Sequence, residues 1–326
     1  MASEQGRRIV RRRTRRQVIT WTTVAATISL LAAALPYLEI RGVAAIPVLQ
    51  ALVPLGAVAL LVFALTSMVF RLWAAALVFV ISAGISGIPT LTPIREGEVC
   101  EAGTPLTVLS FNAKLSGADP AALSELIRTG RPDAVVLLET NETLIDAVRI
   151  QNDLADALPY RTREVTQGQA SGSVILSAHP LSLEENVPGS EFDQVSAVAT
   201  MPGDVDVRLA AAHPPPPVWQ PNGWLSGLDD MAAWVDQTSD DRLIVAGDFN
   251  ASFAHPALRR LASELRTGAE AAGPIPWPTW PEGRLVPAFT AIDHVFARDA
   301  APTDWHSYAV DGSDHRAVVA RWTLCA

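Results

Sequence analysis

Residues 243–250 read LIVAGDFN, an apolar run that stops at an acid and an amide separated by one phenylalanine. A short branched-aliphatic run bounded by glycine predicts a buried β-strand. Asp248 and Asn250 should then stand where that strand leaves its sheet. In α/β sheets the carboxyl ends of strands are where side chains converge on ligands, so both residues are candidates for chemistry.

Other polar residues flank apolar runs in the same way. They are Asn112 after 107–111, Glu139 after 135–138, His213 after 209–212, Asp293 and His294 before 295–296, and Asp314 and His315 before 317–320. One such residue is weak evidence, because an acid that ends a strand is usually solvated and a lone histidine is usually structural. Their recurrence in one region predicts a shared pocket at the mouth of a sheet.

The chain around these runs carries strand and helix signals without an internal repeat. Strands are predicted at 106–111, 134–138, 172–178, 194–201, 205–212, 242–246, 291–297 and 317–324. One helix is predicted from Asp119, as an N-cap before Pro120, to Gly130, and others at 224–237 and 256–266. We therefore expect a mixed α and β domain.

The residue types match the hydrolysis of a phosphoester. That reaction needs a hard divalent cation held by oxygen ligands, a group that activates water, and donors for the phosphoryl oxygens. Asn112, Glu139 and Asp314 can supply the oxygen ligands. They are the predicted metal ligands.

The remaining polar residues can supply the catalytic groups. Asp248 can take a proton from a water molecule that Asn250 positions. His213 and His315 can donate to phosphate, and Asp293 can fix the tautomer of His315 and raise its basicity.

Five short segments, in this order, resemble the endonuclease/exonuclease/phosphatase superfamily: SFN at 110–112, LLET at 137–140, GDFN at 247–250, IDHVFA at 292–297 and SDHRAVVA at 313–320. GDFN and SDH together are specific, whereas SFN or LLET alone is not. The resemblance implies a four-layered α/β/β/α sandwich, a Mg²⁺ or Mn²⁺ ion, and metal-dependent hydrolysis of a phosphoester.

The resemblance also implies roles for single residues. Glu139 corresponds to the principal metal ligand with Asn112 nearby, and Asp314 sits where a metal-proximal acid is usual. The other matches are Asp248 to the residue that activates the nucleophile, Asn250 to its neighbour on phosphate, Asp293 and His315 to a carboxylate–histidine pair, and His213 to a phosphate-contacting histidine. One departure is Lys114, which stands where related DNA-repair enzymes often have an acid and can contact phosphate instead.

The first hundred residues predict a membrane module. Residues 1–17 form a tail with seven arginines, and uncharged stretches follow at 18–38, 42–70 and 72–94. Each is long enough for a helix across a hydrocarbon core of ~30 Å. We expect three transmembrane helices within 18–94, because a cleaved signal peptide, the alternative, explains only the first stretch.

The arginines also predict the orientation. Cytoplasmic flanks favour positive charge, so the tail 1–17 should be cytoplasmic. Three crossings then place the domain 100–326 outside the cytoplasmic membrane of a multi-pass protein. Cys100 and Cys325 bracket that domain, and either one disulfide or two unpaired buried thiols fits the sequence.

Two Pro-rich segments, 214–217 and 273–287, break the strand and helix pattern and should be loops. They are either stiff surface connections or a substrate rim, since each adjoins a candidate catalytic residue. In the second interpretation Trp219 and Trp280, with Lys114, are candidate substrate contacts.

Charge bears on the substrate. Residues 100–326 hold 15 basic and 30 acidic residues, a net charge of −15. Sequence-independent DNA binding depends on Lys and Arg that neutralise phosphates, so this balance favours a small or lipid phosphoester over nucleic acid. A catalytically inactive binding or scaffolding module of the same fold is the alternative, and no sequence feature predicts the oligomeric state.

Overall fold

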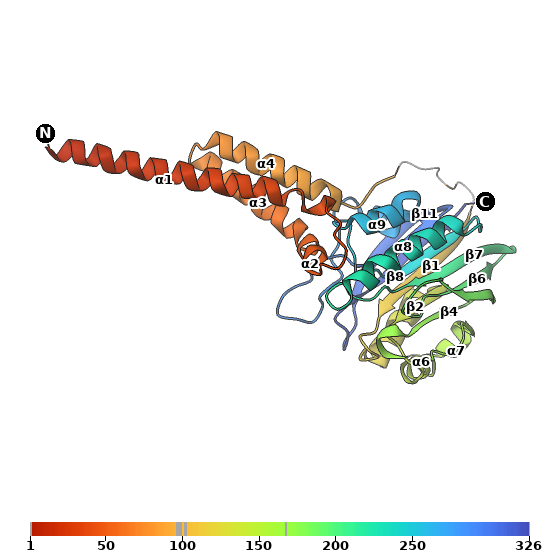
Figure 1. The fold of residues 1–326 in the computed structure, drawn as a ribbon. Coiled ribbons are helices and arrows are strands. Elements are labelled where there is room, and N and C mark those ends of the chain that lie inside the picture. Colours follow the sequence, from red (N-terminus) through yellow and green to blue (C-terminus); the bar gives the residue numbers. More distant parts are fainter. Residues whose placement is uncertain (1, 96–99, 101–102, 167, 326) are drawn as a thin grey trace. The chain divides into compact units, whose positions relative to one another are not determined.

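The computed structural model describes residues 2–95, 100, 103–166 and 168–325. The chain forms two compact units (Figure 1): one holds the residues up to Leu38 together with Leu52–Thr90, and the other holds Glu39–Ala51 with Leu91–Ala326. The predicted boundaries at 17, 94 and 100 stay predictions. The short segment Glu39–Ala51 groups with the second unit, although most of it belongs to the uncharged stretch 42–70.

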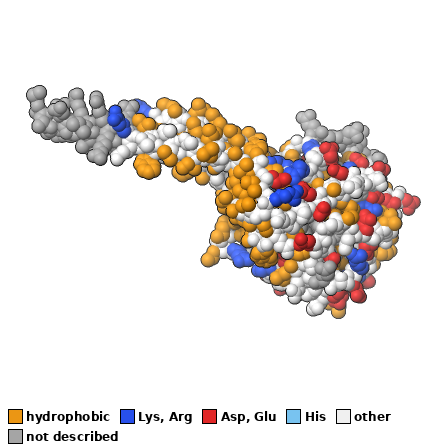
Figure 2. All heavy atoms as spheres, viewed as in Figure 1, with side chains coloured by type: hydrophobic (Ala, Val, Ile, Leu, Met, Phe, Trp, Pro, Cys, Tyr) orange, Lys and Arg blue, Asp and Glu red, His pale blue; other side chains and the backbone are white. Residues whose placement is uncertain are grey.

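The first unit consists of the helices α1 (Ala2–Ala32), α3 (Val53–Val69) and α4 (Trp73–Gly87), with the 3₁₀ turns η1 (Leu35–Tyr37) and η2 (Ile88–Thr90). α3 and α4 are apolar throughout, whereas α1 joins the arginine-rich residues to an apolar part from Val18 onward. Phe79 packs with Ala26 and Ala64, and the hydroxyls of Ser29 and Ser82 lie 3.3 Å apart. Figure 2 shows hydrophobic side chains over the surface of these helices. This exposure suits contact with lipid.

The second predicted span differs from the structure. Residues 42–70 do not form one helix but two, α2 (Ala45–Ala51) and α3, because Pro54 lacks an N–H and its ring conflicts with a preceding helical turn. Two helices, Arg16–Tyr37 and Trp73–Thr90, are long and apolar enough to cross a membrane, or three if the bent pair α2 and α3 counts as one span. The three-helix module stays a prediction.

The second unit is built on two six-stranded sheets. One has the order β11-β12-β1-β2-β4-β3: Ala300–Ala309, Arg316–Leu324, Thr104–Asn112, Ala134–Leu138, Ser173–Ser177 and Tyr160–Arg161. The other has the order β5-β6-β7-β8-β10-β9: Leu181–Asn186, Val195–Met201, Val205–Ala212, Leu243–Asp248, Asp293–Arg298 and Arg266–Thr267. The predicted mixed α/β class with two sheets is confirmed.

Three apolar cores lie between four layers. Along β1, Leu106 and Val108 enter the core between the sheets, whereas Leu109 and Phe111 face the opposite core, because side chains alternate along a strand. That core lies under α5 (Pro120–Gly130), α6 (Glu142–Arg149) and α7 (Leu154–Ala157). The third core joins the other sheet to α8 (Pro221–Gln237) and α9 (Pro256–Leu261), and Figure 1 shows α8 lying along that sheet.

The strand directions bring several strand ends to one edge of each sheet. β1 runs parallel to β2, β7 runs parallel to β8, and Asp293 at the start of β10 pairs with Asp248 at the end of β8. A Cβ on Gly247 would lie 2.0 Å from the carbonyl oxygen of Ala212, so only glycine lets β7 and β8 approach this closely.

A disulfide joins Cys100 to Cys325, whose Cα atoms lie 5.0 Å apart. The first and last strands, β1 and β12, pair antiparallel from Thr104 opposite Leu324, which brings the two cysteines together. Of the two alternatives that the sequence leaves open, the structure therefore contains the disulfide.

Candidate active site

Three residues from the ends of three strands meet through one amide group. The Nδ2 atom of Asn112 donates to Oε1 of Glu139 and to Oδ2 of Asp248, and both distances are 3.0 Å. Asn112 and Asp248 are buried at the ends of β1 and β8, and Glu139 follows β2 directly. The two sheets therefore share one cluster of carboxylates, as the strand endings predict.

His315 lies between two further carboxylates. Its Nδ1 atom is 3.1 Å from each oxygen of Asp293, and its Nε2 atom is 3.7 Å from Oδ2 of Asp248. Burial lowers the pKa of His315, but the charges of Asp293 and Asp248 outweigh burial and raise this pKa well above its usual value. Burial in turn raises the pKa of Asp248, while the His315 charge acts in the opposite direction. The imidazole is therefore held as a cation between the acids.

His213 completes the cluster from the end of β7. Its Nε2 atom lies 3.7 Å from Oε1 of Glu139 and 4.0 Å from Oδ2 of Asp248. The ring is fully buried, neither ring nitrogen has a hydrogen-bond partner among the described residues, and burial lowers its pKa. A buried polar group without a partner is costly, so these nitrogens are suited to a ligand that enters the site.

Asn250 is placed by a strained turn after β8. Its backbone N–H donates to Oδ1 of Asp248 over 2.8 Å, and its Nδ2 donates to the carbonyl of Pro214 over 3.1 Å. Asn250 has φ 49° and Glu139 also has φ 49°, a left-handed conformation that is uncommon outside glycine and recurs at functional sites. The indole of Trp224 donates to the Asn250 carbonyl and so braces this turn from α8.

Three supporting residues lie outside the predicted set. The hydroxyl of Ser313 donates to the carbonyl of Asn112 over 2.8 Å and accepts the N–H of His315. The hydroxyl of Thr279 accepts the N–H of Asp293, and the amide oxygen of Gln194 accepts the N–H of His213. Ser313 sits in the quoted SDHRAVVA segment, but the other two give no sequence signal, because their partners are distant backbone groups.

Other predicted residues lie around this cluster rather than in it. Asp314 forms an ion pair of 2.7 Å with Arg284, and Lys114 is exposed while its N–H donates to Oδ1 of Asn112. Trp219 is 77% exposed, and Trp280 packs edge-on against Phe289. The ligand role of Asp314 and the substrate contacts of Lys114, Trp219 and Trp280 stay predictions.

The cluster suits a divalent cation. Asp248, Asp293 and His315 offer ligand atoms within 4.8 Å of one another, but His315 already balances charge there. Among the residues that the structure describes, the Glu139 carboxylate accepts only the neutral N–H groups of Asn112 and Leu115, so its charge is the better place for a hard cation. The oxygen of Asn112 points to Lys114, so its predicted role as a ligand requires the amide to turn.

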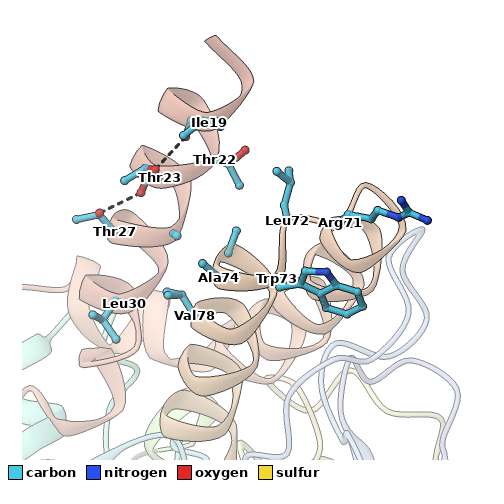
Figure 3. Close-up of a pocket in the computed structure, with 12 residues that line it drawn as sticks. Ile19, Thr22, Thr23, Thr27, Leu30, Arg71, Leu72, Trp73, Ala74 and Val78 are labelled. Carbon is cyan, nitrogen blue, oxygen red and sulfur yellow. Dashed lines mark hydrogen bonds between the residues drawn. The ribbon is translucent and has the colours of Figure 1, made fainter. Parts of the chain in front are cut away.

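A separate groove lies in the helical unit. It is lined from α1 by Ile19, Thr23 and Leu30 and, around the start of α4, by Arg71, Trp73 and Val78 (Figure 3). The figure shows aliphatic and threonine side chains together with the Trp73 indole and the Arg71 guanidinium. This lining lacks carboxylates, so the groove does not match the chemistry of the strand-end cluster.

Sequence patterns of the Endonuclease/Exonuclease/phosphatase family match residues 109–315, from β1 to His315. The chain belongs to this family, whose members are hydrolases that use divalent metals. No curated protein sequence matches the chain.

Solved structures share the fold. A humanized D. rerio TDP2 with 14 mutations has a TM-score of 0.55 at 16% identity, covering 67% of this chain and 99% of that one. D. rerio TDP2 complexed with single strand DNA product has a TM-score of 0.55 at 15% identity, over 68% and 99%. A functionally unknown protein from Enterococcus faecalis V583 gives 0.53 at 12% identity, over 67% and 99%. At these identities the likeness shows the fold alone.

Proposed function

We propose that the chain is a membrane-anchored, divalent-metal-dependent phosphoester hydrolase whose α/β unit acts outside the cytoplasmic membrane. The observation that carries the proposal is the meeting of Asn112, Glu139 and Asp248 from three strands, with His213 and His315 beside the same carboxylates. Membership of a hydrolase family supports it. The apolar helices and the arginine-rich start support the anchor and its orientation.

The metal site centres on Glu139, with Asn112 and Asp314 as further oxygen ligands. Bound Mg²⁺ or Mn²⁺ supplies positive charge to the phosphoryl oxygens. Asp248, fixed by the N–H of Asn250, accepts a proton from the attacking water. This role requires an ionised carboxylate. Burial raises the pKa of Asp248 to about 6 against the effect of the nearby His315 charge, so the carboxylate is still mostly ionised at pH 7.

The two histidines act on the phosphate. Asp293 accepts the Nδ1–H of His315. The Nε2–H of His315 therefore lies on the side of Asp248 and the cluster. His213 is neutral and keeps one N–H to donate to a phosphoryl oxygen. Both donors are buried, where hydrogen bonds to a developing charge are strongest.

The substrate is a small or lipid phosphoester. The excess of 15 acidic over basic charges in residues 100–326 repels an extended polyanion, which makes nucleic acid the less favoured substrate. A small phosphoester needs only the local donors of His213 and His315 together with the metal.

The test uses the full chain in detergent micelles on a panel of phospholipids, nucleotides, sugar phosphates and DNA, with Mg²⁺, Mn²⁺ or chelator. Asp248→Asn and His315→Gln should each lower metal-dependent hydrolysis by about 10²–10⁴-fold. His306→Gln is the control, because His306 is exposed and pairs with Asp304. A wild-type protein inactive on the whole panel would contradict hydrolysis and favour the inactive binding module.

The orientation has its own test. Protease added to intact cells should digest the α/β unit and leave the apolar helices protected. Digestion that occurs only after lysis would place the unit in the cytoplasm and contradict the proposed side of the membrane.

A further inference from the structure

Exposed hydrophobic side chains in the second unit gather on a few segments. Most of them are Ile40, Val43, Val48 and Leu49 in Glu39–Ala51; Leu91 and Ile94; Val218 and Trp219; and Ile275, Trp277, Leu285 and Val286. Five others, among the described residues, lie elsewhere: Leu115, Ile150, Tyr160, Leu183 and Tyr308. A concentration of exposed apolar side chains indicates a contact surface.

Ion pairs hold the first of these segments on α8 and α9. Arg260 of α9 pairs with Glu39 over 2.6 Å and with Asp229 of α8 over 2.8 Å, and Arg41 pairs with the same Asp229. His255, at the start of α9, has its Nε2 atom 2.9 Å from the carbonyl of Pro47. The exposed side chains of Glu39–Ala51 therefore lie beside α9 and α8.

The second segment lies beside the loop 273–287. The N–H of Thr92 donates to the carbonyl of Pro274 over 2.9 Å, next to Ile275. Arg95 donates to the carbonyl of Ala262 just after α9. Leu91, Ile94, Ile275 and Trp277 thus belong to the same face as Glu39–Ala51, and we call this face the apolar rim.

The chain connections between the apolar rim and the candidate membrane spans indicate that the rim faces a bilayer surface. Glu39 follows the candidate span Arg16–Tyr37 by two residues, and Thr92 follows the candidate span Trp73–Thr90 by two residues. Two residues reach at most about 7 Å, so a face built from Glu39 and Thr92 stays at the surface of any bilayer that these helices cross. Tryptophan is enriched at that depth, as in Trp277, and the long side chains of Arg41 and Arg260 can extend to it.

The same rim reaches the candidate active site through the loop 273–287. Arg284 pairs with Asp314 over 2.7 Å, and Glu282 donates its N–H to the Asp314 carbonyl and pairs with Arg316. The base of the loop is therefore fixed beside His315. Beyond it, Leu285 is fully exposed and Val286 is 56% exposed, which leaves an apolar tip next to an arginine.

We propose that the tip Leu285–Val286 enters the lipid headgroup region and that the substrate is a phosphoester carried by a membrane lipid. This inference rests on the proposed hydrolase function. Arg284 is placed to meet a lipid phosphate, and the apolar tip meets the adjoining acyl chains. Water adds to the phosphorus, one ester P–O bond breaks, and the departing alcohol oxygen takes a proton.

The membrane contact is tested with the full chain in nanodiscs. Leu285→Cys, labelled with an environment-sensitive fluorophore, should be quenched by lipids brominated on their acyl chains. Ile150→Cys is the matched control, because Ile150 is 84% exposed and lies on none of the segments that form the apolar rim. Equal quenching, or no quenching, at the two positions overturns the contact.

The substrate class is tested with two substrates in the same preparation. The double variant Leu285→Ser with Val286→Ser should hydrolyse nanodisc phospholipid, drawn from a panel of headgroups, at about one tenth of the wild-type rate or below. Its hydrolysis of water-soluble bis-p-nitrophenyl phosphate should match the wild type, as should both activities of Ile150→Ser. If the wild type hydrolyses the soluble ester but no phospholipid, the lipid substrate is overturned. If the wild type hydrolyses neither substrate, the proposed function is overturned, and the quenching result alone decides the membrane contact.

Discussion

His255 should make the stability of the protein depend on pH. Its ring is 1% exposed, its Nδ1 atom accepts the N–H of Ser252 over 2.9 Å, and its Nε2–H donates to the carbonyl of Pro47. The edge of Trp224 packs on the ring, with centroids 5.4 Å apart. Burial lowers the pKa of His255 from 6.5 to about 4. The carbonyls of Pro47 and Ser252 favour the protonated ring, but burial outweighs them, so the folded state resists protonation.

The direction of this pH dependence follows from proton linkage. Above pH 6.5 the ring is neutral in both states and the folded protein has its full stability. As the pH falls from 6.5 toward 4, the unfolded chain binds a proton that the folded chain excludes, so the free energy of unfolding decreases. The shift between these two values corresponds to about 3 kcal/mol in total, of which about 2 kcal/mol is lost by pH 5.

Urea unfolding of the full chain in detergent, followed by tryptophan fluorescence at pH 7.5 and pH 5, measures this loss. His255→Gln keeps a donor for Pro47 but does not titrate, so its unfolding free energy should change by about 2 kcal/mol less than that of the wild type between these pH values. His306→Gln should behave as the wild type, because His306 is 59% exposed. Equal pH dependence of His255→Gln and the wild type would refute the reasoning.

Three further predictions concern the disulfide, the core and the metal. Replacing Cys100 and Cys325 by serine should lower the free energy of unfolding by about 5 kcal/mol in the chain-entropy treatment, since the bond closes a loop of 225 residues; an unchanged urea midpoint would contradict this. Phe249→Ala should cost about 3–5 kcal/mol, because the ring is fully buried against Phe296; the same titration measures it, and a loss below 1 kcal/mol would mean that the site collapses around the cavity. Glu139→Gln should abolish the heat of Mg²⁺ binding in calorimetry, whereas His306→Gln should retain it. If Glu139→Gln also retained the heat, the metal site would have to lie at Asp248 and Asp293 instead.

The position of the strand-end cluster could be predicted because two rules of β-structure act together. An apolar run must end where its sheet ends, and parallel neighbours end on the same side. Asp248 at the end of β8 and His213 directly after β7 therefore had to be neighbours once both runs were recognised as strands. The hairpin of β6 and β7 followed equally from Pro202 and Gly203 between two apolar runs.

Other elements carry no such pattern. The strand β11 is as long as any in the sheet, yet its sequence AAPTDWHSYA contains a proline and few alternating apolar residues, because it pairs only with β12 and exposes much of its length. The strand β5 at the edge of the other sheet is mostly exposed for the same reason. An edge strand forms because it pairs with its one neighbouring strand, so its own sequence predicts it poorly.

Roles that depend on hydrogen bonds between distant segments could not be predicted either. His255 lies in none of the quoted motifs, and its acceptor Pro47 stands 208 positions earlier in an uncharged stretch. That stretch predicts only a membrane span, because hydropathy does not distinguish a residue that faces lipid from one that packs on α9. The pairing of Arg284 with Asp314 is equally invisible, since 30 residues of loop and strand separate them.

These contacts determine how the chemistry can be studied. A fragment that begins at Cys100 would retain every strand and every candidate catalytic residue, but it would lack Glu39–Ala51 and Thr92. The Nε2–H of His255 would then lose its acceptor, Arg260 would lose Glu39, and the carbonyl of Pro274 would lose its donor. Of these three groups the His255 ring is buried, and a buried polar group without a partner costs about 1–3 kcal/mol, a loss that falls on α9. Arg260 and Pro274 are exposed, so water can replace their lost partners. The segments next to the apolar helices are therefore structural parts of the α/β unit as well as connections to those helices.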